Sequence, residues 1–186
     1  MKNLENPCVL LVGMVVILCG ISSVGYAWVT NPNNGHQYAL TNYGTWEQAE
    51  AEAVVAAGHL ATINDEAENT WLATFIKDSY TQNGQSLLNW NLAWIGLYRD
   101  NALSTDWHDF KWVSGEPVTY FAGTPWINEP GKYAYLHGLN HYAAGTWFWD
   151  TTIENSYQSQ GIIEVPEPAT LSLLVISGLA LLRRRK

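Results

Sequence analysis

The sequence predicts an α+β fold for the central part of the chain, and three patterns support this. Two amphipathic helical patterns come first, over residues 45–57 and from about residue 65 to residue 75. Short strand-like runs lie around them, at 36–40, 59–63, 92–97, 110–113, 147–149 and 161–165. The span from Gly115 to Gly145 has little regular pattern but many proline and aromatic residues, which predicts a long irregular loop with a packed interior.

The first helix has clear start and stop signals. Thr45 is followed three residues later by Gln48, which is the spacing of a capping box. Gly58 is the expected C-terminal stop, because glycine adopts the left-handed conformation that often ends a helix. The predicted buried face is formed by Trp46, Ala49, Ala53, Val54 and Ala57.

The second helix is expected to begin after Asn64 or Asp65, since either side chain can cap a helix. Its predicted apolar face is formed by Ala67, Trp71, Leu72 and Phe75. The run from Leu92 to Leu97 is apolar on both faces, which predicts a fully buried strand.

Composition excludes several classes of function. The region from Trp28 to Val165 has four Lys or Arg and fifteen Asp or Glu, a net charge of −11, which argues against a nucleic-acid partner. Both cysteines, Cys8 and Cys19, lie outside this region, so it has no disulfide and no cysteine-ligated zinc. Tryptophans on apolar faces, Trp46, Trp71, Trp94 and Trp112, are expected in the core.

Residues 1–27 are predicted to be a secretory signal peptide. Lys2 precedes an apolar run from Val9 to Ile21, and Ala27 ends a short small-residue motif suited to a signal peptidase. The alternative is an uncleaved membrane anchor, although the run is shorter than the roughly 20 residues that span a bilayer.

Residues 166–186 form a second distinctive end. Pro166, Glu167 and Pro168 precede an apolar stretch, residues 169–182, and a basic tail, residues 183–186. At about 1.5 Å per residue the stretch reaches roughly 21 Å, short of the roughly 30 Å hydrocarbon layer, so it favours a transient membrane stop.

This end resembles the PEP-CTERM sorting signal of Gram-negative bacteria. The resemblance implies recognition by an exosortase, cleavage near Pro166 to Pro168, and delivery to the cell surface or exopolysaccharide matrix. The alternative is a durable single-pass anchor that leaves the central domain outside the inner membrane.

The central region, residues 28–165, resembles the C-type lectin-like domain. The resemblance lies in the segment from Trp46 to Ile63, in Glu68 and Phe75, in Trp94-Ile95-Gly96-Leu97, and in the segment from Trp112 to Pro117. It implies a C-type lectin-like fold with two helices, short antiparallel strands and a long irregular loop. Its terminal strands, 36–41 and 161–165, are expected to pair. The usual disulfides of the family are missing, so packing must substitute for them.

The resemblance also implies a site for sugar and calcium. Family members that depend on calcium use a Glu-Pro-Asn loop and a Trp-Asn-Asp strand. Glu129 and Asp150 match acidic positions of these motifs, and they are the expected calcium ligands and ligand-binding acids. Trp126 and Trp149 complete the expected ligand-binding set.

Two residues depart from the calcium-site pattern. Gly131 has no side-chain oxygen where asparagine is usual, and Lys132 stands where another acid is expected. Calcium takes six to eight oxygen ligands at about 2.3–2.6 Å, so loss of two ligands weakens the site. A calcium site and a solvated acidic loop therefore both remain open, as do cis and trans forms of Pro130.

No enzyme is predicted. His137 and His141 have helical zinc-ligand spacing, but Gly138 and Asn140 between them favour a loop, and no nucleophile motif occurs. The predicted function is an exported carbohydrate-binding protein of the cell surface or matrix. The alternative is a structural or protein-interaction module of the same fold.

Overall fold

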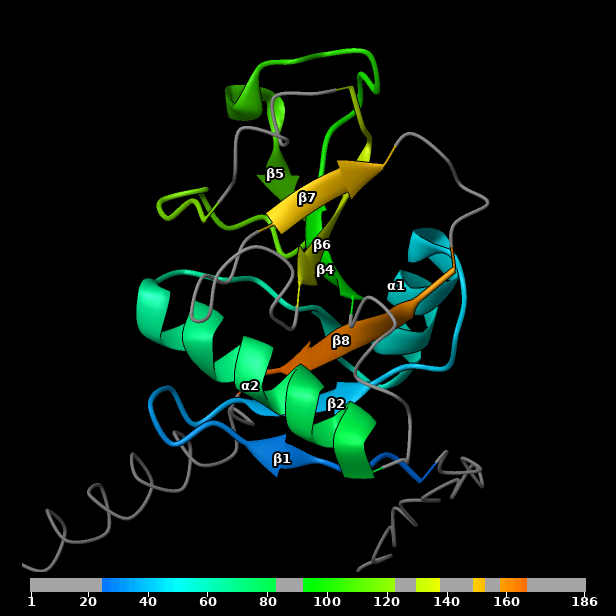
Figure 1. Cartoon of the computed structure of the whole chain (residues 1–186), viewed down its shortest axis with the longest axis vertical. Coiled ribbons are helices and arrows are strands. Elements are labelled where there is room, and N and C mark those ends of the chain that lie inside the picture. The colour runs from blue at the N-terminus through cyan, green and yellow to red at the C-terminus, as the bar shows by residue number, and fades with distance from the viewer. Residues whose placement is uncertain (1–24, 83–91, 123–129, 138–148, 153–157, 167–186) are drawn as a thin grey trace, which may run out of the picture.

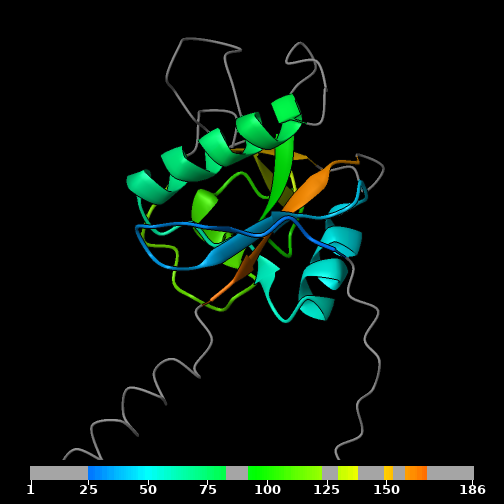
Figure 2. The same cartoon turned by 90° about the horizontal axis from the view of Figure 1, so that it is seen from below.

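The computed structural model describes residues 25–82, 92–122, 130–137, 149–152 and 158–166. Two helices and short strands build the domain, and Figure 2 shows the helices on opposite sides of the strands β2 and β8. The elements are β1 (Val29–Thr30), β2 (Gln37–Leu40), α1 (Trp46–Val55), β3 (His59–Leu60), α2 (Glu66–Gln82), β4 (Leu92–Tyr98), the 3-10 helix η1 (Trp107–Asp109), β5 (Lys111–Trp112), β6 (Tyr133–His137), β7 (Trp149–Thr152) and β8 (Gln160–Val165).

The strands form one mixed sheet in the order β1-β2-β8-β4-β6-β7, with β3 beside β8 and β5 beside β4 (Figure 1). The expected pairing of the terminal strands is confirmed, since β2 and β8 are antiparallel with Gln37 opposite Val165 and Leu40 opposite Ile162. Antiparallel strands were expected, but the sheet is mixed, because β4 and β8 run parallel at Ala93 and Trp94.

Helix α1 begins as predicted. The Thr45 hydroxyl accepts a hydrogen bond from the Gln48 amide, and the Gln48 side chain accepts one from the Thr45 amide, so both halves of the capping box are present. Its buried residues are Trp46, Ala49 and Ala53. Val54 is 59% exposed, so its expected place on the buried face is wrong.

The end of α1 differs from the expectation. Ala57, and not Gly58, adopts the left-handed conformation, with a φ of 63°. Ala57 also lies beyond the helix and is exposed, so its predicted place on the buried face is wrong. Gly58 instead allows the backbone to pack closely against β8, because a Cβ there would collide with the backbone carbonyl of Glu164.

Helix α2 is capped by Asp65, whose carboxylate accepts a hydrogen bond of 2.8 Å from the Glu68 amide. Its face toward the core includes Leu72, Ala73, Phe75, Ile76 and Tyr80. The expected burial of Ala67 is wrong, since Ala67 is exposed while Glu68 and Asn69 beside it are buried. Glu68 and Asn69 therefore occupy the part of the buried helix face that the apolar pattern predicted for Ala67.

Aromatic packing holds the core together. Trp46, Trp94 and Trp112 are buried as predicted, while Trp71 is only partly buried and stacks on Phe75 at 5.7 Å between ring centroids. The Trp46 indole also donates a hydrogen bond of 2.8 Å to the Ile95 carbonyl, which ties α1 to β4. A buried indole thus contributes both apolar packing and a hydrogen bond between two elements.

The predicted long loop contains a central strand. β6 lies inside the span from Gly115 to Gly145 and pairs with both β4 and β7, so the irregular assignment is wrong for residues 133–137. Residues 1–24 of the predicted signal sequence, the PEP-CTERM helix and tail, and the strand residue Trp147 lie outside the described residues. Within the described ranges, no helix combines the length and hydropathy that crossing a membrane requires.

Candidate functional site

Strands β6 and β7 place Asp150 on one face of the sheet. Tyr135 is directly opposite Asp150, and Tyr133 is opposite Thr152. Because side chains alternate along a strand, these four side chains and His137 share one face, whereas Trp149 and Thr151 face the other side. The sheet register thus surrounds this acid with aromatic groups.

The Asp150 carboxylate is held ionised. Burial opposes its charge, but the neighbouring His137 ring and hydrogen bonds from the Thr151 amide and the Tyr135 hydroxyl outweigh burial and lower its pKa. The Tyr135 hydroxyl is 3.2 Å from Asp150 Oδ2, and His137 Nε2 is 3.8 Å from the same oxygen. The side chain keeps 26% exposure, so its oxygens remain accessible to a ligand.

Trp149 belongs to the core, so its expected contact with a ligand is wrong. The side chain is fully buried and packs edge-on against Trp112 at 5.4 Å between ring centroids. Its indole nitrogen donates a hydrogen bond of 2.8 Å to Asn69 Oδ1 on α2. Trp149 therefore positions β7 and does not contact a surface ligand.

The structure explains the missing asparagine at position 131. The Gly131 backbone packs so closely on β7 that a Cβ would collide with the Thr151 side chain. Lys132, expected to bring positive charge toward a cation, instead places its ammonium 5.1 Å from the centre of the Tyr133 ring. This segment is thus shaped for contact with β7.

Trp126 and Glu129 lie outside the described residues, and so does the peptide bond that joins Glu129 to Pro130. Their roles as ligand-binding residues, and that of Glu129 as a calcium ligand, stay predictions. Pro130 itself is exposed. His137, predicted to lie in a loop, lies on β6 and is buried, and His141 lies outside the described residues.

Arg99, which no sequence pattern marks, is fully buried behind this segment. Its Nε donates a hydrogen bond to the Gly131 carbonyl, and its backbone amide donates one of 3.0 Å to the Lys132 carbonyl. Its guanidinium also lies 4.5 Å from the centre of the Phe110 ring. Arg99 therefore fixes the segment that follows Glu129 and Pro130.

A second polar cluster joins the chain's terminal strands to α2. Ligand atoms of His36, Glu68 and Glu164 lie within 4.8 Å of one another, so these side chains could together hold a metal ion. His36 Nδ1 is 2.5 Å from Glu164 Oε1, and the Tyr38 hydroxyl donates a hydrogen bond of 2.6 Å to Glu68 Oε1. No pattern in the sequence predicts that these side chains meet.

Burial controls the protonation of this cluster. It raises the pKa of the Glu68 carboxyl, although hydrogen bonds from Tyr38 and from the Asn64 amide oppose the shift. It also raises the pKa of the Tyr38 hydroxyl, which therefore stays protonated and donates. Two buried carboxylates thus share one tyrosine hydroxyl, which lies 3.3 Å from Glu164 Oε1.

The fold and the site together define a lectin-like binding domain. Snaclec bitiscetin subunit alpha of Bitis arietans is 32% identical to this chain over 115 residues, which are 61% of this chain and 76% of the relative. The chain belongs to the C-type lectin-like family. No family model matches it.

Solved structures share the fold at lower identity. Human lithostathine has a TM-score of 0.56 at 20% identity and covers 74% of this chain and 88% of its own. The cow C-type carbohydrate-recognition domain of CD23, solved with a GlcNAc2Man3 oligosaccharide, has a TM-score of 0.55 at 17% identity over 76% and 95%. The calcium-independent C-type lectin SPL-2 of Saxidomus purpuratus has a TM-score of 0.52 at 21% identity over 74% and 90%.

Proposed function

We propose that this chain is an exported carbohydrate-binding protein whose ligand contacts Asp150 and the partly exposed side chains beside it, Tyr135 and Thr152. The observation that carries the proposal is the ionised, partly exposed Asp150 carboxylate beside the Tyr135 hydroxyl. A carboxylate accepts hydrogen bonds from sugar hydroxyls, and neighbouring aromatic groups pack on the apolar face of a sugar ring. The carbohydrate-binding relatives support this choice of ligand.

Three residues are proposed to contact the sugar. Asp150 accepts hydrogen bonds from sugar hydroxyls, Glu129 supplies a second acceptor, and Trp126 provides a stacking surface. Arg99 contributes indirectly, because it holds the backbone of Gly131 in place.

Two sets of residues are candidates for binding calcium. Glu129 and Asp150 are the predicted calcium ligands at the sugar site, while Gly131 supplies no side-chain ligand there. His36, Glu68 and Glu164 form a separate set with two carboxylates and an imidazole. Calcium titration followed by melting temperature, with the Asp150→Asn and Glu164→Gln variants, assigns any calcium-induced stabilisation to one set.

A glycan array tests the proposed function directly. The natural chain is expected to retain a defined set of glycans, and Asp150→Asn is expected to lose them. Asp78→Asn is the matched control, because Asp78 is an exposed acid on α2. Binding that disappears in chelator supports a metal-bridged contact, and binding that persists supports a direct contact. An array without any bound glycan contradicts the proposal.

The ends of the chain support a route to the outside. We propose that residues 1–27 direct export and that an exosortase cleaves near Pro166 to Pro168 after transient membrane insertion of residues 169–182. Delivery to the cell surface or exopolysaccharide matrix of a Gram-negative bacterium would follow. Secreted protein is expected to lack a tag fused after Lys186, and recovery of that tag on the secreted protein contradicts cleavage.

One surface favours the alternative of a protein-binding module. Val29 is 43% exposed on the edge strand β1, beside a hollow of about 260 Å³ that Trp71 and Phe75 also line. Exposed apolar edges of this kind suit protein contacts. Loss of a protein partner on Val29→Lys, together with an empty glycan array, would favour this alternative.

A further inference from the structure

A small polar cavity lies between the turn that joins β1 to β2 and the start of helix α2. Its volume is about 140 Å³, and all seven of the described residues that line it are polar. They include Asn31, Asn33, Asn34 and His36 of the turn, and Asp65 and Glu68 at the start of α2. We call this space the turn cavity.

Hydrogen bonds hold the walls of the turn cavity in place. Within the turn, the Asn31 amide donates a hydrogen bond of 2.9 Å to the His36 carbonyl, and the Gly35 amide donates one of 2.8 Å to the Asn31 carbonyl. The Asn34 side chain ties the turn to α2, since its Nδ2 donates a hydrogen bond of 2.9 Å to Glu68 Oε1. The cavity is therefore formed before any ligand arrives, which lowers the entropy cost of binding.

Asn31 brings an unused hydrogen-bond donor to this cavity. Asn31 is fully buried, and its Nδ2 has no hydrogen-bond partner among the described residues. The Asn33 amide donates a hydrogen bond of 3.0 Å to Asn31 Oδ1, which fixes the orientation of the side-chain amide and makes the unused atom a donor. Buried donors are nearly always paired with protein, water or a ligand. Because Asn31 lines the turn cavity, we expect an acceptor oxygen there.

The charges of the lining restrict the chemistry of this acceptor. The acidic side chains of Asp65 and Glu68 line the same cavity and disfavour an anionic ligand. A metal ion supplies no acceptor for Asn31 Nδ2. A hydroxyl accepts from the amide and also donates to a carboxylate, so it satisfies both kinds of lining group. The charges therefore favour a neutral ligand with several hydroxyls.

The volume of the turn cavity suits one sugar unit. Water occupies about 30 Å³ per molecule in the liquid, so the cavity has room for about four or five waters. One edge of a sugar ring presents several hydroxyls, which can replace such waters and reproduce their hydrogen bonds. The cavity offers no apolar side chain among its described lining residues, which disfavours an apolar peptide side chain as the ligand.

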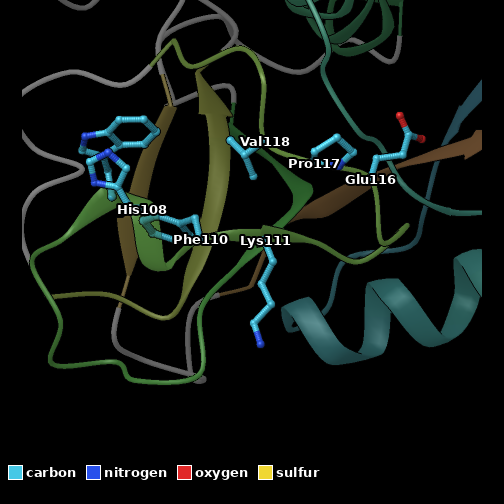
Figure 3. Close-up of a pocket in the computed structure, with 7 residues that line it drawn as sticks. His108, Phe110, Lys111, Glu116, Pro117 and Val118 are labelled. Carbon is cyan, nitrogen blue, oxygen red and sulfur yellow. The ribbon is translucent and has the colours of Figure 1, made fainter.

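A larger hollow beside β5 lacks an unused buried donor. Figure 3 shows this hollow, of about 320 Å³, with Lys111 and Glu116 among its lining residues. Both side chains already have partners, because Lys111 lies 2.6 Å from Asp100 and Glu116 accepts a hydrogen bond of 3.0 Å from Asn64. Within the described ranges, no buried side-chain donor without a partner lines this hollow.

From the unused Asn31 donor and the polar lining we infer that the turn cavity binds one unit of a neutral sugar through its hydroxyls. This inference does not rest on the proposed contact at Asp150. The turn cavity adjoins β1 and β2, whereas Asp150 is on β7, at the opposite end of the strand order β1-β2-β8-β4-β6-β7. The two sites are therefore separate.

The test follows the side-chain amide resonance of Asn31 by NMR in the ¹⁵N-labelled natural chain. The probes are glucose, galactose, mannose and N-acetylglucosamine, added as monosaccharides in the presence of a chelator. N-Methylacetamide, as a peptide-like amide, and calcium chloride without chelator are the comparison probes. At least one sugar is expected to shift the Asn31 resonance in a saturable way, with a millimolar dissociation constant.

Two variants change the lining without removing the fold. Asn33→Ala removes an exposed side chain, and Asp65→Asn keeps a residue that caps helices as well as aspartate does. Each is expected to weaken sugar binding by about fivefold or more. Asn101→Ala is the matched control, because Asn101 is an exposed asparagine outside the turn cavity. Its affinity should equal that of the natural chain.

Asp150→Asn separates this inference from the proposed function, because this variant is expected to keep the Asn31 shift. Loss of the shift in Asp150→Asn would contradict a separate site. An Asn31 resonance that no sugar moves, or that responds only to N-methylacetamide or calcium, would overturn the inference. Affinities of Asn33→Ala and Asp65→Asn equal to that of the natural chain would also overturn it. The glycan array decides independently on the contact at Asp150.

Discussion

The Trp149 indole nitrogen lies 2.8 Å from Asn69 Oδ1, and this hydrogen bond fastens β7 to helix α2. Both side chains are buried, Trp149 fully and Asn69 almost fully. The strand that carries Asp150 is therefore held by a contact between residues 80 positions apart in the sequence. The neighbouring Asp150 side chain lies on the other face of the sheet and is partly exposed, while the tryptophan faces the core.

Replacing Trp149 by phenylalanine tests this role. The variant keeps an aromatic ring but removes the donor, so the buried Asn69 oxygen loses its partner. Unfolding free energy is expected to fall by about 1–3 kcal/mol, measured by chemical denaturation. Trp28→Phe is the control, because Trp28 is 36% exposed. Equal stability of both variants would contradict a core role for Trp149.

Ala57 offers a stabilising substitution. Its left-handed φ of 63° disfavours any residue with a Cβ, so Ala57→Gly is expected to raise the unfolding free energy by up to about 1 kcal/mol. Ala56→Gly should lower it, since Ala56 has an ordinary φ of −78°. Thermal or chemical denaturation measures both, and a loss of stability in Ala57→Gly would show that the backbone strain is absent.

Gly131→Asn introduces the asparagine that the resemblance to calcium-dependent lectins leads one to expect, yet it is expected to destabilise this chain. The new side chain meets Thr151 of β7, and such overpacking costs about 1–3 kcal/mol. Gly25→Ala is the control, since a Cβ there meets nothing within 4 Å. Gained calcium affinity at unchanged melting temperature would refute this explanation of Gly131.

Glu68 is expected to make stability depend on pH. Burial raises its pKa above the ordinary 4.5, so the folded chain holds this proton more tightly than the unfolded chain does. The contribution of Glu68 to stability is therefore present below about pH 4.5 and is lost as pH rises through the folded pKa.

Glu68→Gln removes this titration and should flatten the dependence of melting temperature on pH above 4.5. The control is Glu66→Gln, an exposed position on the same helix. A pH profile of Glu68→Gln that coincides with that of the natural chain would show that Glu68 does not titrate differently on folding.

Local signals predicted the parts of the fold that local chemistry determines. The capping box of α1 needs only Thr45 and Gln48, and both hydrogen bonds formed as expected. The pairing of β2 with β8 followed from the family resemblance. The family resemblance also predicted that Asp150 lies on a strand. Its environment beside β6 supports its proposed role.

The remaining parts depend on contacts that the sequence does not display. β6 lacks a period-two pattern because it is buried on both faces, so Tyr133, Ala134, Leu136 and His137 are all covered. Arg99 bonds to backbone carbonyls, which carry no sequence signal. Glu68 and Glu164 meet only in the folded chain, because they lie far apart in the sequence, on α2 and β8.

The pairing of β1, β2 and β8 has a consequence for how the domain is presented. The described chain enters at Gly25, beside β1, and leaves at Pro166, just after β8, while β5 and β7 lie toward the opposite end of the molecule (Figure 1). A tether at either terminus would therefore hold the domain by its base and orient β5 and β7 outward. Such a stalked arrangement would leave β7 and Asp150 open to a ligand, without steric obstruction from whatever the tether is fixed to.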